Sequence, residues 1–366
     1  MSGPNETLTP RQRWLALLEG KPVDRIPTDY WATREFDAKL KAHVGVADDE
    51  ALWDQLEIDH PRQLRLGMVS PDPPADPDVD LWGVRHQRIT YAGGVYLEVA
   101  PGGRPLANAT SAAEIRSYPL PSPDIYDYES IRRAAAEDDG YRPVRAGGFE
   151  PFLLYCKLRG LEQGFEDLLV NPEIADALLG RIFEFFYEHN RLILEAGGGK
   201  IDLFYLAEDL GSQHGPLMSL ETYRRFLLPN QIRMADLARS YGAHVFYHTD
   251  GAARPFLPDL IDKVGIEILN PIQWRCSGME RDALARDFGD RVVFHGAVDN
   301  QYTLAFGTPE EVAHEVETNA RLFQDARWIC APCHNIQPVS PPENVVTMYE
   351  TVRQLEPHGA LKGPSV

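Results

Sequence analysis

The stretch Ala243-His244-Val245-Phe246-Tyr247-His248-Thr249-Asp250-Gly251 places metal-capable side chains directly after an apolar run. Residues Ala243–Tyr247 are mostly β-branched or aromatic, which predicts a buried β-strand. A second stretch follows the same plan, with Arg327–Ile329 running into Cys330-Ala331-Pro332-Cys333-His334. In an α/β barrel, side chains at the carboxyl ends of the strands converge on one mouth. We therefore expect the two distant clusters to meet in one site.

Three further apolar runs also end in polar residues, namely Ile201–Leu206, Ile266–Leu269 and Arg291–Phe294. A helical pattern separates each run from the next, and this alternation is typical of parallel βαβ units. No Gly-x-Gly-x-x-Gly motif opens these helices, so a dinucleotide-binding fold has no support. We predict an α/β fold in which residues 1–366 form a single (β/α)8 TIM barrel. Five of its eight strand-helix units can be recognised in the sequence.

Local sequence signals also predict where several helices begin. One segment departs from the alternation of strands and helices. Helices are expected to begin at Thr9-Pro10, at Asn171-Pro172 and at Thr308-Pro309, where Glu311 completes a capping box. Residues 79–106 instead alternate and turn like antiparallel strands. We expect them to form a β-hairpin excursion near the barrel mouth.

Bulk composition narrows the class of partners. The chain has 366 residues, of which 43% are hydrophobic and 25% charged, and its formal net charge is −19. Such an acidic surface repels nucleic acid and anionic lipid, so neither is expected as a partner. The sequence shows no secretory signal, no run long enough to span a membrane and too few cysteines for a disulfide framework. We expect a cytoplasmic protein.

The sequence contains two patterns that could bind a metal ion. His248 and Asp250 are two positions apart, so on an extended segment they face the same way and could share one metal ion. Such a pair alone is more often a hydrogen-bonded structural pair. Cys330-x-x-Cys333 suggests a redox or zinc site, but no second Cys pair accompanies it and Cys330 falls within the strand run. Cys333, beside His334, is better placed for function.

Adjacent carboxylates follow the Ile201–Leu206 run. Glu208 and Asp209 point to opposite faces of an extended segment, so we expect one of them to enter the site as a base or ligand while the other caps a helix. The alternative that both of them cap the next helix stays open. His295 and Asp299 flank a glycine turn, where structural hydrogen bonding and catalysis fit equally well.

Several of these segments resemble motifs of the uroporphyrinogen decarboxylase superfamily. The segment from Glu208 to Ser219 resembles its "DDLGxQxGPLxS" motif, and the segment from His295 to Asp299 is similar to its "HGGID" turn. The segment from His334 to Asn344 resembles its "HNIQ…PPEN" motif, and the segment from Arg25 to Trp31 resembles its "R-x-P…W" motif. The resemblance spans nearly the whole chain in the same order, and it implies a single (β/α)8 barrel.

The superfamily has two branches with different chemistry. One decarboxylates uroporphyrinogen without a cofactor and holds the carboxylates with an arginine-rich loop. In this chain only Arg34 follows Trp31 at that place, so a substrate with eight carboxylates is discounted. The other branch consists of zinc-dependent methyltransferases that move methyl groups between corrinoid proteins and small acceptors. Its His-x-Cys and later Cys ligands align with His248, Asp250 and His334.

The resemblance to the second branch implies a divalent metal, with zinc ahead of iron and manganese. Its expected ligands are His248, Asp250 and His334, with Cys333 as a substitute. Glu208 or Asp209 would manage the proton, and His295 is a further catalytic candidate. The residues expected to contact the substrate are Trp31, Arg34, Gln213, Asn270 and Gln273.

The predicted function is a metal-dependent methyltransferase or demethylase component that acts on a small methylated compound, with a corrinoid protein as its expected partner. Two alternatives stay open. One is a decarboxylase or other lyase, in which Arg34 would bind the carboxylate of a small acid. The other is a non-catalytic small-molecule-binding barrel. The substrate and a homodimer are also left open.

Overall fold

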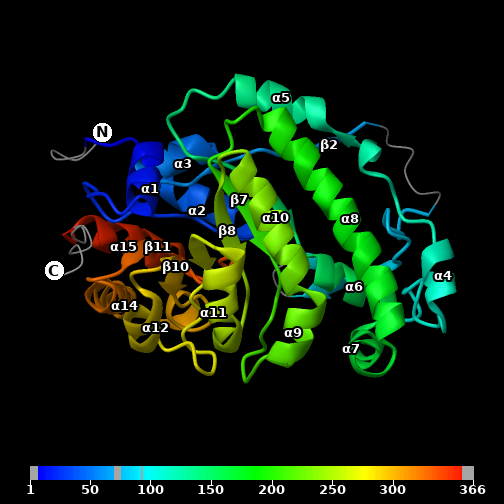
Figure 1. The fold of residues 1–366 in the computed structure, drawn as a ribbon. Helices are drawn as coiled ribbons and strands as arrows, with labels where there is room; N and C mark the ends of the chain where they lie inside the picture. Colours follow the sequence, from blue (N-terminus) through cyan, green and yellow to red (C-terminus); the bar gives the residue numbers. More distant parts are fainter. Residues whose placement is uncertain (1–6, 70–75, 92–93, 357–366) are drawn as a thin grey trace.

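A curved parallel β-sheet forms the centre of the molecule. The computed structural model describes residues 7–69, 76–91 and 94–356. The sheet has seven strands in the order β1-β6-β7-β8-β9-β10-β11, and Figure 1 shows β7 and β8 in its middle, with α8 and α10 beside them. The strands are β1 (Arg62–Gln63), β6 (Val144–Phe149), β7 (Leu203–Ala207), β8 (His244–His248), β9 (Ile268–Asn270), β10 (Val293–Val298) and β11 (Arg327–Pro332).

The two edges of this sheet approach each other. Beyond β11, Thr28 forms a parallel bridge with Cys330, and the Asp29 N–H donates to the Cys330 carbonyl at 3.0 Å. Beyond β1, the Asp59 carboxylate accepts the Thr28 N–H at 3.1 Å, and the Asp59 N–H donates to Thr28 Oγ1 at 3.1 Å. Side-chain hydrogen bonds therefore join the edges, which is consistent with a TIM-like barrel.

Helices surround the sheet, and the starts predicted from sequence are confirmed. Thr9 and Thr308 both form capping boxes, with Gln12 and Glu311 respectively. The longer helices are α1 (Pro10–Leu18), α2 (Arg34–Val44), α5 (Tyr128–Ala136), α6 (Pro151–Arg159), α7 (Leu161–Val170), α8 (Pro172–Gly197), α10 (Leu228–Ser240), α12 (Arg281–Phe288), α14 (Pro309–Leu322) and α15 (Pro342–Arg353). The shorter ones are α3 (Asp49–Gln55), α4 (Ala112–Ser117), α9 (Leu220–Phe226), α11 (Leu257–Asp259) and α13 (Thr303–Phe306).

An apolar ring fills the lower interior of the curved sheet. Each of the strands β7 to β11 contributes one fully buried side chain, and these are Leu203, Phe246, Ile268, Val293 and Ile329. They pack against Trp14 and Leu17 of α1, which covers this end of the barrel. Each such side chain contributes about 1.5–3 kcal/mol when buried. The ring therefore fixes the register in which residues further along each strand reach the site.

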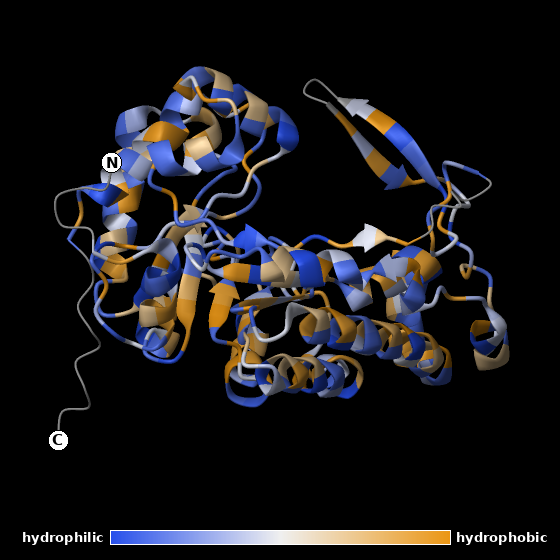
Figure 2. Cartoon of the chain, turned by 90° about the horizontal axis from the view of Figure 1, so that it is seen from above, coloured by the Kyte–Doolittle hydropathy of each residue, from blue (hydrophilic) through white to orange (hydrophobic). Residues whose placement is uncertain are grey.

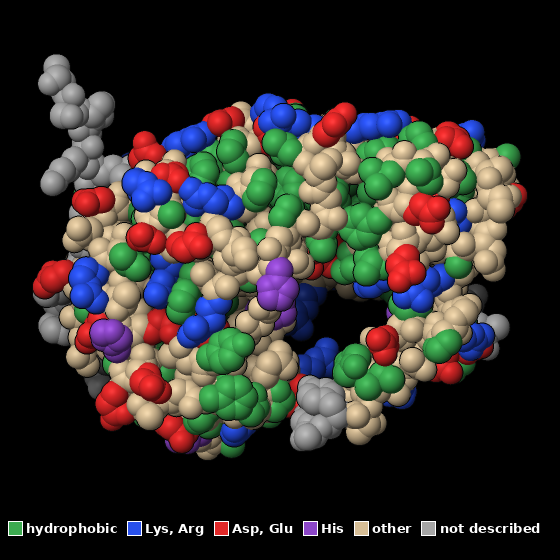
Figure 3. Space-filling model, turned by 90° about the horizontal axis from the view of Figure 1, so that it is seen from below, with side chains coloured by type: hydrophobic (Ala, Val, Ile, Leu, Met, Phe, Trp, Pro, Cys, Tyr) green, Lys and Arg blue, Asp and Glu red, His purple; other side chains and the backbone are tan. Residues whose placement is uncertain are grey.

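A β-hairpin extends away from this body. Strands β3 (His86–Tyr91) and β4 (Gly94–Val99) pair antiparallel, and Figure 2 shows them standing off the body as an arm. The hairpin lies within the excursion expected for residues 79–106. A smaller antiparallel pair joins β2 (Gly67–Met68) to β5 (Tyr126–Asp127). On the face shown in Figure 3 the molecule is deeply hollowed, with histidine and basic side chains at the edge of the hollow.

The five strands predicted from apolar runs are confirmed as β7 to β11, with ends shifted by a few residues. The strand at residues 144–149 escaped prediction because its sequence, Val-Arg-Ala-Gly-Gly-Phe, lacks a β-branched run. Among the described residues, no helix is long and apolar enough to cross a membrane.

Candidate active site

A polar layer lies directly above the apolar ring. Because strand side chains alternate between two faces, the residue two positions beyond each ring residue points into the same interior. In β7, β8, β9 and β10 these residues are Tyr205, His248, Asn270 and His295. Three of the four were predicted from sequence as site residues, and strand alternation explains why they lie together.

Hydrogen bonds link three residues of this layer, His248, Asn270 and His295, into one chain. His248 Nδ1 lies 2.6 Å from Asn270 Oδ1, and Asn270 Nδ2 lies 2.7 Å from His295 Nδ1. His295 Nε2 lies 2.9 Å from Asp29 Oδ2, which also accepts Trp31 Nε1–H at 2.7 Å. Burial acts to raise the pKa of Asp29, but the nearby cations and hydrogen bonds outweigh it and hold the pKa well below its ordinary value. The chain therefore ends on an ionised carboxylate.

This chain sets the tautomer of His248. Burial lowers the pKa of His295, so this imidazole is neutral. When its Nε2–H donates to Asp29, its Nδ1 must accept from the Asn270 NH2 group. The Asn270 oxygen then accepts Nδ1–H from His248. In the neutral tautomer of His248 that this arrangement selects, Nε2 carries the lone pair, which can bind a metal ion or accept a proton.

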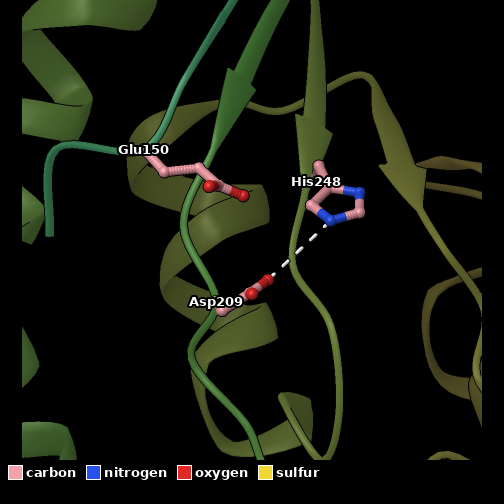
Figure 4. Close-up of side chains that lie close together, drawn as sticks. All are labelled: Glu150, Asp209 and His248. Carbon is pink, nitrogen blue, oxygen red and sulfur yellow. Dashed lines mark ion pairs between the residues drawn. The ribbon is translucent and has the colours of Figure 1, made fainter. Parts of the chain in front are cut away.

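Two carboxylates meet this nitrogen. Ligand atoms of Glu150, Asp209 and His248 all lie within 4.8 Å of one another, and Figure 4 shows the three side chains directed toward a common point. His248 Nε2 is 3.8 Å from Asp209 Oδ1. Glu150 follows β6, Asp209 follows β7 and His248 ends β8, so three adjacent strands supply the group from their carboxyl ends. We call Glu150, Asp209 and His248 the acidic triad.

Asp250 and His334 extend the cluster toward solvent. Asp250 Oδ1 lies 3.7 Å from His248 Nε2, and its Oδ2 lies 3.6 Å from His334 Nε2. Burial raises the pKa of Asp250, while His248 and His334 oppose that rise. Burial also raises the pKa of Glu150, and the Asp209 carboxylate raises it further. These carboxylates repel one another when ionised.

A divalent cation would remove this repulsion, and the donor set fits one. One imidazole nitrogen and two carboxylates suit zinc in a site with an open position, and they suit iron or manganese as well. Asp250 Oδ1 is buried without a hydrogen-bond partner, so one further acceptor faces the cluster. The residues present therefore match the chemistry of a divalent metal site.

Cys333 does not belong to this group, which corrects its place among the expected ligands. Its Sγ–H donates to the Ile272 carbonyl at 3.1 Å. Burial raises the pKa of the Cys333 thiol well above its ordinary value, and Asp299 raises it further. The thiol is engaged by a backbone carbonyl, and Cys333 is outside the group of described residues whose ligand atoms lie together.

The two adjacent acids at the end of β7 take different roles. Asp209 enters the acidic triad, whereas both oxygens of Glu208 accept the Phe152 N–H, at 2.9 and 3.0 Å. Burial raises the pKa of Glu208 well above its ordinary value. Glu208 thus caps α6 from the neighbouring strand, and its expected role as a base or ligand stays a prediction. Glu150 occupies the N-cap position of α6, yet its side chain makes no cap hydrogen bond.

The remaining predicted residues either belong to the hydrogen bonds and ring contacts around His248 or line cavities near it. His295 and Asn270 belong to the hydrogen-bond chain that reaches His248, and their expected roles in catalysis and substrate binding stay predictions. Trp31 supports the same imidazole, because its ring stacks on His248 with centroids 6.1 Å apart. Arg34 lines a cavity beside the site, and Gln213 and Gln273 line another at the mouth.

Sequence reasoning missed Glu150 and Asp29. Glu150 stands before Pro151, a usual first residue of a helix, but the preceding strand was not recognised and its carboxyl end was therefore not searched. Asp29 follows the quoted Arg25-Ile26-Pro27 motif, and only the bridge from Thr28 to β11 shows that this segment enters the barrel. Neither residue carries a local signal of its function.

Residues 89–355 match the sequence profile of the family described as uroporphyrinogen decarboxylase (URO-D). The chain belongs to this family. A curated relative, the uroporphyrinogen decarboxylase of Edwardsiella ictaluri (strain 93-146), is 25% identical over 276 residues, which cover 72% of this chain and 74% of the relative. The resemblance seen in the sequence is confirmed, and members of this family are enzymes.

Solved structures support the same fold. A methyltransferase from Methanosarcina mazei superposes with a TM-score of 0.67 at 19% identity, covering 94% of this chain and 98% of that one. A B12-independent methionine synthase from Shewanella sp. W3-18-1 aligns with a TM-score of 0.40 at 11% identity over 62% of this chain and 65% of that chain. The first likeness concerns the fold, and the second is too weak to carry an argument.

Proposed function

We propose that this member of the uroporphyrinogen decarboxylase family is a metal-dependent methyltransferase that acts on a small methylated compound. The observation that carries the proposal is the acidic triad, in which Nε2 of His248 and the carboxylates of Glu150 and Asp209 lie within 4.8 Å of one another. The fold shared with the Methanosarcina mazei methyltransferase agrees with it. A divalent metal, zinc first and iron or manganese next, would be held by these three residues.

A bound divalent ion would supply Lewis acidity, which lowers the pKa of an oxygen or sulfur on the methyl-bearing or methyl-accepting compound. The chain itself provides the orientation. Asn270, His295 and Asp29 hold the imidazole of His248 with its Nε2 toward the carboxylates. A lone pair fixed in this way loses no rotational freedom on binding, which favours both affinity and geometry.

Asp250 and His334 supply a path for protons at the rim. Their facing atoms lie 3.6 Å apart, and the side chains are 25% and 38% exposed. Because burial raises the pKa of Asp250, its protonated carboxyl is favoured there and can donate a proton to a compound bound at the rim. This pair therefore serves a compound bound at the mouth without requiring the buried triad to change its protonation.

A corrinoid protein is the methyl carrier that fits this proposal. The site opens at the carboxyl ends of the strands, the face on which barrel enzymes admit substrates. Methyl transfer to an external corrinoid needs access from that face, and the rim residues Asp250 and His334 are partly exposed there. Free cob(I)alamin is small enough to stand in for a protein-bound corrinoid in an assay.

The test is transfer of a methyl group to cob(I)alamin by zinc-loaded protein, followed by the change in the corrinoid absorption spectrum. Wild-type protein should produce methylcobalamin from a methylated donor, and His248→Ala should lose at least about 100-fold in rate. His314→Ala, an exposed histidine of α14, serves as the matched control and should keep the wild-type rate. Equal rates for His248→Ala and wild type would refute the proposal.

One observation favours a second function, the decarboxylation of a small carboxylic acid. A cavity of about 420 Å³ beside the triad is lined by Arg34, Arg65 and Arg145. Arg145 is 8% exposed, and its Nη1 is buried without a hydrogen-bond partner, 3.5 Å from Asp29. A substrate carboxylate could bind there. Release of carbon dioxide by metal-free protein, abolished by Arg34→Ala, would favour this lyase over methyl transfer.

A further inference from the structure

An open cavity of about 660 Å³ lies at the mouth of the site, where Asp250 and His334 are found. Asp250 and His334 contribute to its wall, so a compound in the cavity would lie next to the rim pair. Its size suits a molecule of one or two rings. The chemistry of the other walls therefore indicates which compounds the site admits.

Carboxamides dominate the polar lining of this cavity, and they are Gln213, Gln273, Asn300, Gln301 and Gln337. Hydrogen bonds hold several of them in place: Gln273 Oε1 accepts the Gly251 N–H at 2.6 Å, and Gln213 Nε2 donates to Gln301 Oε1 at 3.4 Å. Each amide offers a donor and an acceptor without net charge. The described residues that line the cavity include no Lys or Arg.

The outer wall of the same cavity is apolar. Tyr302, Phe306 and Val339 line it, and they are 60%, 71% and 54% exposed. Isolated exposed apolar side chains are common, but these three share one concave surface with Asp250. They offer flat apolar contact to a ring or hydrocarbon segment that lies across the carboxamides.

Electrostatics disfavour an anion in this cavity when the acidic triad holds no metal ion. The Asp250 carboxylate lines the cavity, and no described lining residue carries a permanent positive charge to compensate. The basic residues Arg34, Arg65 and Arg145 line a separate cavity. An anionic group in the carboxamide cavity would lose its hydration and gain no ion pair.

We infer that the carboxamide cavity binds an uncharged, oxygen-bearing compound with an apolar face, such as a methyl ether. This inference rests on the proposed function, because it names the substrate class for the same site. The carboxamides bind its hydroxyl or ether oxygens, and Tyr302 and Phe306 contact its apolar face. Discrimination against an anion follows from charge, since neutral carboxamides beside the Asp250 carboxylate offer an anionic group no ion pair.

A matched pair tests the inference by calorimetry on metal-free protein. The probes are 3-methoxybenzyl alcohol and 3-methoxybenzoate, which share one skeleton and differ in charge. The alcohol should bind at least about tenfold more tightly than the anion. Gln301→Lys places a cation on the exposed wall and should bring the benzoate close to the alcohol in affinity. Gln354→Lys, beyond the end of α15, should leave the wild-type order unchanged.

Failure to bind the alcohol, or equal or tighter binding of the benzoate by wild-type protein, would overturn the inference. An unchanged order in Gln301→Lys would overturn it as well, because the cavity wall would then play no part in the discrimination. These results are separate from the proposed function, since calorimetry reads binding without turnover. Loss of methyl transfer with the affinity order intact would refute the methyltransferase and leave the cavity assignment standing.

Discussion

The side-chain oxygen of Asn270 lies 2.6 Å from Nδ1 of His248, and this contact fixes which nitrogen of the imidazole faces the carboxylates. Asn270 is 1% exposed, and its amide nitrogen contacts His295 on the other side. The pair therefore connects the acidic triad to Asp29 in the barrel interior.

Replacing Asn270 by Leu should weaken zinc binding about 10–100-fold, because His248 loses the acceptor that holds its tautomer. The measurement is zinc affinity by competition with a chromophoric chelator. Asn190→Leu is the matched control, since Asn190 is 4% exposed on α8 and contacts Met234 instead of a site residue. Equal losses of affinity in the two variants would show that general destabilisation, not orientation of His248, is responsible.

Glu208 and Asp209 are neighbours with opposite expected behaviour. Glu208→Gln should keep zinc binding and change the free energy of unfolding by less than about 1 kcal/mol, because the pKa of Glu208 is raised and a neutral side chain can still accept the Phe152 N–H. Asp209→Asn should lose zinc binding while the protein stays folded. Zinc titration and urea unfolding of both variants check this, and the reverse pattern would mean that the structure assigns the two acids wrongly.

Asp59 should be among the most sensitive positions for stability. Its carboxylate lies 2.5 Å from Arg13 and 2.6 Å from Arg25, and the residue has no exposed surface. Asp59→Ala should lower the free energy of unfolding by about 3–5 kcal/mol, since two buried guanidinium groups lose their shared counter-charge and the sheet edges lose the hydrogen bond from the Thr28 N–H to the carboxylate. Glu129→Ala, which breaks an exposed pair with Arg132, should cost less than about 1 kcal/mol. Similar losses in urea unfolding would contradict the joining role of Asp59.

His189 should make stability depend on pH. Burial lowers the pKa of this imidazole from 6.5 to about 4 in the folded protein. Between these values the unfolded chain binds the proton and the folded chain does not, so stability is full above about pH 6.5 and falls as the pH drops toward 4. At pH 5 the loss should reach about 2 kcal/mol.

The measurement is urea unfolding at pH 7 and pH 5. His189→Gln keeps an acceptor for the Tyr128 hydroxyl, which lies 2.6 Å from Nδ1, and should show a smaller decrease between the two pH values than wild type. His314→Gln, an exposed control, should show the wild-type decrease. If the decrease were as large in His189→Gln as in wild type, the buried imidazole would not be its source.

The sequence predicted the second half of the barrel better than the first, and the reason is physical. Strands β7 to β11 are mostly apolar, with many β-branched and aromatic residues, and they are buried on both faces. This pattern can be recognised without a structure. The Thr28 segment and β1 are short, and β6 contains Gly147 and Gly148, whose φ angles are +94° and +117°. Their pairing depends on contacts with distant residues such as Asp59, which local sequence does not reveal.

The site residues likewise divide into those that the sequence predicts and those that it does not. His248, Asp250 and His334 could be predicted because each follows a run that the sequence identifies as a strand. The choice between Glu208 and Asp209 depends instead on the direction in which each side chain points after β7 ends. Glu150 depends on a strand that the sequence hides, and the role of His295 depends on its contact with Asp29. Register and long-range hydrogen bonding decide these assignments, and neither can be derived from a single segment.

The most direct test of the account is the zinc stoichiometry and affinity of chelator-treated protein, measured by calorimetry for wild type and for the triple variant Glu150→Gln/Asp209→Asn/His248→Ala. The account predicts one tightly bound ion per wild-type chain and none in the triple variant, with circular dichroism showing the same fold in both. Absence of binding by the wild type, or equal binding by the folded triple variant, would contradict the claim that these three residues form a metal site.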